Sequence, residues 1–142
     1  MMTEDVIGKK YEALIDFLLT QCTHFAFVED RRLMEIEEER LAYVELLTEA
    51  IRWDLIERTV VREWATTRLT DSTAYVYTFH MNFRTAQFLK ERSSSLFGWM
   101  LPELPEDIMF YAGDTCVLAV CSHERYFIVD EAMWRRFERG IK

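Results

Sequence analysis

The sequence predicts an α+β fold, in which helices pack on a mainly antiparallel sheet of four to six strands. Three short apolar segments, 108–111, 116–121 and 126–129, follow one another with only tight turns between them. Such runs are typical of antiparallel hairpins. Apolar residues on both sides of this stretch recur at helical spacing. With 142 residues, half of them hydrophobic, the chain is long enough to form a single domain over residues 1–142.

The first two predicted helices occupy the acidic half of the chain. Apolar side chains repeat at helical spacing over about 4–21 and again over roughly 33–53. Four glutamates lie near the start of the second helix: Glu35, Glu37, Glu38 and Glu39. The helix dipole favours acidic side chains at this position. Between the helices, residues 23–28 fit an edge strand and a buried linker equally well.

The second half of the chain is predicted to alternate between strands and short helices. The predicted strands are 59–67, 74–81, 107–112, 115–121 and 126–129. For the first of them a helix over 54–68 is the competing interpretation, because the segment contains neither glycine nor proline. Asn82 is a suitable N-cap for a helix over about 83–92, and Asp130 for a final helix.

The net charge of −8 lies entirely in the first part of the chain. Residues 1–57 contain 14 acidic and 6 basic side chains, and residues 58–142 contain 11 of each. An acidic protein repels phosphate backbones and anionic lipids, so we expect neither nucleic acid nor a membrane as the main partner. A protein partner with a basic surface fits this charge better. The N-terminus lacks a signal-peptide pattern, which predicts a cytoplasmic location.

The sequence contains no motif that indicates catalysis, a cofactor or a metal. His24, His80 and His123 have no metal-ligand spacing. Ser93–Ser95 is not part of a nucleophile elbow, and four glycines are too few for a phosphate-binding loop. We therefore expect no catalytic residues, no cofactor and no enzymatic activity.

Eight residues are the candidate contacts to a protein partner: Glu35, Glu37, Glu38, Glu39, Trp64, Trp99, His123 and Glu124. The glutamates would attract a basic partner. The two tryptophans border predicted loops, where they could line a groove, and core packing is the alternative for them. His123 and Glu124 lie in a tight turn between two strands, which presents side chains to the surroundings.

One stretch resembles a pattern in small uncharacterised bacterial proteins. It begins at Trp99, continues through PELPEDIMFY, a turn and a short apolar strand, and ends in Ser122-His123-Glu124. Some proteins with this pattern carry sporulation labels, and others resemble immunity proteins that are paired with toxins. The resemblance covers residues 99–127 and departs at Ile108-Met109, where a leucine is expected. It implies a binding function and supplies no catalytic residues.

The expected function is therefore that of an immunity or antitoxin protein, which neutralises a toxin by direct binding. A regulatory or structural protein, with a homodimer among the compatible states, is the first alternative. The second is a small-ligand-binding protein or an enzyme with a pocket near His80 and His123.

Overall fold

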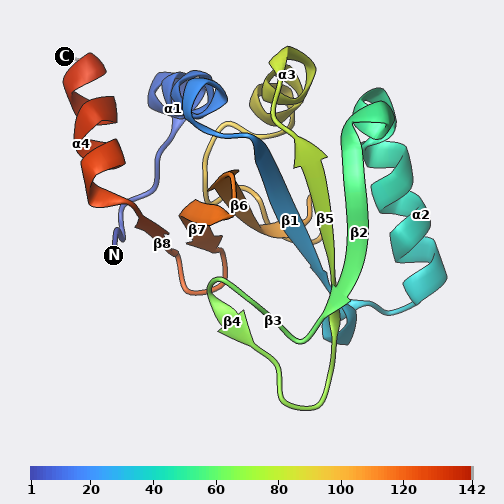
Figure 1. Ribbon diagram of the computed structural model, residues 1–142. Coiled ribbons are helices and arrows are strands. Elements are labelled where there is room, and N and C mark those ends of the chain that lie inside the picture. Colours follow the sequence, from blue (N-terminus) through green and yellow to red (C-terminus); the bar gives the residue numbers. More distant parts are fainter. Residues whose placement is uncertain (142) are drawn as a thin grey trace.

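A six-stranded antiparallel sheet forms the centre of the structure, a computed structural model that describes residues 1–141 (Figure 1). The elements are α1 (Gly8–Gln21), β1 (His24–Asp30), η1 (Arg31–Leu33), α2 (Glu37–Leu47), η2 (Glu49–Asp54), β2 (Leu55–Val61), β3 (Glu63–Trp64), β4 (Thr67–Arg68), β5 (Ala74–His80), α3 (Phe83–Arg92), β6 (Glu106–Ala112), β7 (Thr115–Cys121), β8 (Tyr126–Val129) and α4 (Glu131–Gly140). The strand order is β2-β5-β1-β6-β7-β8, with β3 and β4 forming a separate small ribbon. The predicted α+β class and the antiparallel meander are confirmed.

The central strand β1 comes from the segment that the sequence left undecided. It pairs with β5 from His24↔His80 to Asp30↔Ala74, and with β6 on its other side. All its residues after His24 are buried. A strand covered on both faces has no polar alternation, which explains why the sequence pattern did not identify it.

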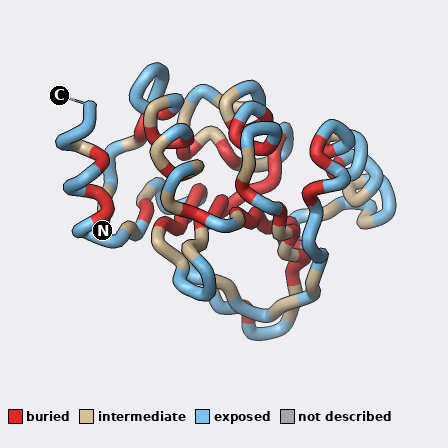
Figure 2. The backbone as a smooth tube through the Cα atoms, turned by 45° about the horizontal axis from the view of Figure 1, so that its top comes forward, coloured by how far each residue is buried: buried red, intermediate tan, exposed pale blue. Residues whose placement is uncertain are grey.

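Each face of the sheet is covered differently. The main core contains apolar residues of all four α-helices together with Phe25 and Phe27 of β1. The opposite face carries a smaller cluster that includes Ala26, Val28 and Leu69. The β3–β4 ribbon and its loops extend over this second face (Figure 1). Figure 2 shows the buried residues gathered along the central strands and on the inner sides of the helices.

The boundaries of three predicted elements differ from the structure, and the first is the helix over about 4–21, which begins only at Gly8. The predicted helix over 33–53 is divided into η1, α2 and η2. The break falls at Thr48, whose hydroxyl donates to the Val44 carbonyl (2.9 Å) in competition with the helical backbone pattern. The helical alternative for 54–68 is wrong, because β2 pairs with β5 there. The predicted strand over 59–67 is confirmed as far as Val61, and a bend at Arg62 separates it from β3.

A buried hydrogen-bond chain joins α1, α3 and the loop after α3. The Trp99 indole N–H donates to the Tyr11 hydroxyl (2.9 Å), and this hydroxyl donates to the Leu89 carbonyl (2.6 Å). All three residues are fully buried. Burial raises the pKa of the Tyr11 hydroxyl well above its ordinary value, although Trp99 opposes the shift. Tyr11 thus remains a neutral donor and acceptor inside the core.

We expect Tyr11→Phe to lower the free energy of unfolding by about 1–3 kcal/mol, because the Trp99 N–H loses its acceptor inside the core. Urea denaturation measures the change. Tyr43→Phe is the matched control, since Tyr43 is exposed and its hydroxyl also donates to a carbonyl, that of Glu103. Tyr43→Phe should lower the free energy of unfolding by less than about 1 kcal/mol. Equal losses in the two variants would contradict this account.

Candidate functional site

The predicted acidic cluster lies at the start of α2, and its four glutamates have different roles. Glu37 accepts hydrogen bonds from Arg31 Nε (2.6 Å) and from the Tyr75 hydroxyl (3.0 Å), and these contacts lower its pKa. Glu35, Glu38 and Glu39 are exposed, and none of the three forms an ion pair within residues 1–141. Three of the four candidates are therefore free to meet a partner, and Glu37 fixes the local structure.

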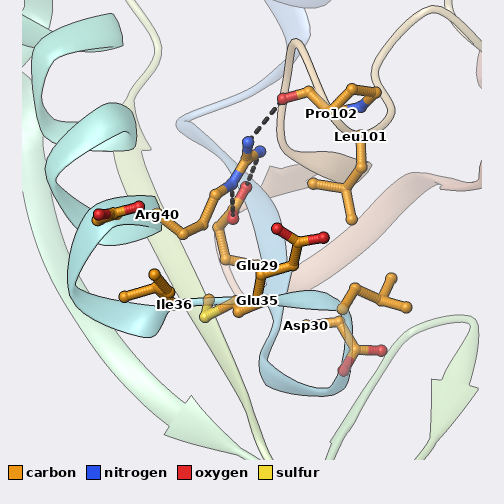
Figure 3. Close-up of a pocket in the computed structure, with 10 residues that line it drawn as sticks. Glu29, Asp30, Glu35, Ile36, Arg40, Leu101 and Pro102 are labelled. Atoms are coloured by element: carbon orange, nitrogen blue, oxygen red, sulfur yellow. Dashed lines mark hydrogen bonds and ion pairs between the residues drawn. The ribbon is translucent and has the colours of Figure 1, made fainter.

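A pocket of about 450 Å³ opens beside these glutamates (Figure 3). Its apolar lining residues are Leu33, Met34, Ile36, Leu101 and Pro102, and its charged ones are Glu29, Asp30, Glu35, Glu39 and Arg40. Leu33 and Ile36 are 46% and 53% exposed, which is high for large apolar side chains. The pocket thus combines an apolar wall with a mostly acidic rim.

Arg40 is the residue that holds this pocket in shape. Its Nε and Nη2 atoms donate to the two carboxylate oxygens of Glu29, and its Nη1 donates to the Pro102 carbonyl (2.6 Å) (Figure 3). Glu29 is only 1% exposed. Burial raises the pKa of Glu29 above its ordinary value, and the hydrogen bonds from Arg40 oppose the shift. The bidentate contact with Arg40 therefore compensates for the hydration that the Glu29 carboxylate loses on burial.

A second group of polar residues lies where β6 begins. Glu106 is 1% exposed, and its Oε2 lies 2.9 Å from His123 Nε2 without an aligned hydrogen bond. Burial, reinforced by Asp107 and then by Asp30, raises the pKa of Glu106 from 4.5 to about 8, while Arg32 opposes the shift. His123, which the sequence singled out, is thus anchored to a buried carboxyl that the sequence pattern did not identify.

Asp107 connects the same region to Trp64 and to the turn before β8. Its Oδ2 accepts from the Trp64 indole N–H (2.9 Å), and its Oδ1 accepts from the Ser122 backbone N–H (2.8 Å). Trp64 is half-buried and packs against the smaller core cluster. These contacts give Trp64 a structural role. Glu124, next to His123, is exposed.

Two further expectations about these residues are corrected by the structure. Trp99 is 0% exposed, so it belongs to the core and not to a surface groove. His80 pairs with His24, which pairs with Tyr111 on its other side, at one end of the sheet, whereas His123 contacts Glu106 at the other end. A single pocket near His80 and His123 is therefore not formed.

The most exposed aromatic side chains belong to residues that the sequence did not single out. Trp53 is 83% exposed and Phe83 is 86% exposed. Phe83 lies at helical spacing with the buried Ala86 and Leu89, so its position in the sequence did not distinguish it from a core residue. Phe83 lines a groove of about 450 Å³ between η2 and α3 together with Ala50, Ile51 and Phe88.

Residues 1–141 contain no candidate metal site. Within this range no three His, Cys, Asp or Glu side chains are grouped so that they could hold a metal ion. None of the described helices has the length and apolar character that crossing a membrane requires. No family model, curated protein or solved structure matches the chain.

Replacing Arg40 should reveal how much the pocket depends on it. We expect Arg40→Met to cost about 3–5 kcal/mol of unfolding free energy, because the buried Glu29 carboxylate would lose its charged partner. The double variant Glu29→Met/Arg40→Met should recover most of this loss, since both charges are removed together. Chemical denaturation of the single and double variants tests the expectation. A double variant as unstable as the single one would disprove the charge argument.

The raised pKa of Glu106 predicts a pH dependence of stability. The folded protein holds this proton more tightly than the unfolded chain does, so the linked stability is complete below about pH 4.5 and is lost as the pH rises through about 8. We expect wild-type protein to lose more stability than Glu106→Gln between about pH 6 and about pH 9. Urea denaturation at both pH values measures the difference.

Glu124→Gln is the control for this comparison, because it removes a carboxylate from an exposed position nearby. The control should follow the wild-type pH dependence. Parallel curves for wild type and Glu106→Gln would show that Glu106 does not take up the proton.

Proposed function

We propose that the protein is a binding protein that neutralises a basic protein partner by direct contact in the cytoplasm, in the manner of an immunity or antitoxin protein. The observation that carries the proposal is the surface at the start of α2. There, Glu35, Glu38 and Glu39 lack ion-pair partners within residues 1–141, and Glu35 and Glu39 line the same pocket as the exposed apolar side chains of Leu33 and Ile36.

Charge and apolar area would contribute differently to such binding. Unpaired carboxylates attract a basic surface over about 8–10 Å at moderate salt and speed the encounter. Leu33 and Ile36 would lose water on contact, and the neighbouring pocket offers room for one side chain of the partner. A cationic side chain would find the carboxylates of Glu35 and Glu39 at the rim of this pocket.

The alternatives gain less support. A regulatory protein would use the same kind of surface, and only the identity of the partner distinguishes it from an immunity protein. A small-ligand-binding protein or an enzyme was expected to use His80 and His123 together, and these residues lie at opposite ends of the sheet. The binding role therefore remains the proposal that the surface supports best.

The test begins with capture of the partner from the source cell and continues with its association rate. We expect Glu35→Lys/Glu39→Lys to slow association by about tenfold at low salt and to flatten the salt dependence, with little change in dissociation. Glu12→Lys/Asp114→Lys changes the net charge equally at exposed positions outside α2 and should leave the rates near those of wild type. A partner with an acidic surface, or equal rates for the two double variants, would contradict the proposal.

A further inference from the structure

The pocket beside the start of α2 contains four carboxylates, and two of them are already occupied. Both oxygens of Glu29 and both oxygens of Asp30 accept hydrogen bonds from arginine side chains. Glu35 and Glu39 line the same pocket, and within residues 1–141 neither side chain forms an ion pair. The carboxylates that the pocket offers to a ligand are therefore those of Glu35 and Glu39.

The positive charge of Arg40 in the pocket wall is compensated within the protein. Its guanidinium group donates to Glu29 and to the carbonyl groups of Pro102 (2.6 Å) and Leu104 (3.2 Å), so its N–H groups are engaged. The four carboxylates of the lining are matched by two arginines, Arg40 and Arg32. Two negative charges therefore remain uncompensated, and a cationic group fits the pocket better than a neutral or an anionic one.

The walls of the pocket are apolar and come from two parts of the chain that are far apart in sequence. They are formed by Leu33, Met34, Ile36, Leu101 and Pro102. Figure 3 shows Leu101 and Pro102 on the opposite side of the pocket from Ile36, with the Glu35 carboxylate directed toward Leu101. A side chain that enters the pocket would therefore contact apolar walls along its length and a free carboxylate at Glu35.

We propose that this pocket receives one arginine side chain of the basic partner, an inference that rests on the proposed function and specifies its ligand. A guanidinium group is planar and more weakly hydrated than an ammonium group, so it loses less water between apolar walls. Glu35 precedes α2 and Glu39 lies in its first turn. The forked N–H groups of arginine can donate to both carboxylates, whereas the ammonium group of lysine is a compact point charge. The pocket therefore selects arginine over lysine.

Titration of the protein alone with Nα-acetyl-arginine methylamide, here called blocked arginine, tests the inference without the partner. Two-dimensional NMR of the backbone amides follows the titration, and the signals of Leu33, Glu35 and Leu101 should shift. We expect saturable binding with a Kd on the order of 1 mM, and binding of the corresponding lysine compound that is at least about fivefold weaker. Equal affinities for the two compounds, or no binding of blocked arginine up to about 20 mM, would overturn the inference.

Glu35→Gln and Glu38→Gln are a matched pair of variants, because each removes one exposed carboxylate and only Glu35 lines the pocket. We expect Glu35→Gln to weaken the binding of blocked arginine about tenfold, and Glu38→Gln to weaken it less than about twofold. Leu33→Ser removes part of the apolar wall without a change of charge and should weaken binding about fivefold. Far-ultraviolet circular dichroism confirms that each variant is folded. Equal weakening by Glu35→Gln and Glu38→Gln would show that only the net surface charge acts, and would disprove the site.

The captured partner separates this inference from the proposed function. Replacing the exposed arginines of the partner with lysine, one at a time, keeps its charge and therefore its electrostatic attraction. One such replacement should raise the dissociation rate about tenfold, and Glu35→Gln should remove most of this difference. Slowed association of Glu35→Lys/Glu39→Lys, together with no effect of any arginine replacement, would overturn the inference and leave the proposed function intact.

Discussion

The burial of β1 is the constraint on which the rest of the structure depends. A strand between two others must pair its backbone on both sides, and β5 and β6 provide these partners. The same burial extends to the polar end of the strand, so that Glu29 and Asp30 are almost without exposure. Buried carboxylates require charged partners, which Arg40 and Arg32 supply. The position of α2 follows from this requirement.

Helix α2 is held mainly by polar contacts, and this explains why it offers so much surface. Val44 is its one buried residue, while Arg40 and Tyr43 bind the carbonyl groups of the 102–104 loop. A helix with a narrow apolar side exposes most of its residues. The acidic surface lies at its start, where Glu38 and Glu39 are exposed.

Elements with strong local signals were predicted closely. Helix α3 begins after its Asn82 cap and ends at Arg92 as expected, and the strands β7 and β8 have the predicted bounds. The signals in these segments are caps, turns and short apolar runs, which act within a few residues. The break at Thr48 was missed because a side-chain hydrogen bond within a helix leaves the apolar spacing almost unchanged.

The sequence by itself determined the fold class and the concentration of negative charge in the first half of the chain, because both follow from composition and local spacing. Only the tertiary structure decided which aromatic residues are exposed. Trp99 is enclosed by Tyr11 and Phe88, whereas Trp53 lies beyond the edge of the packed core. The contact between Glu106 and His123 likewise arises from strand pairing. Helical or strand spacing defines a face, and long-range packing determines whether that face is covered.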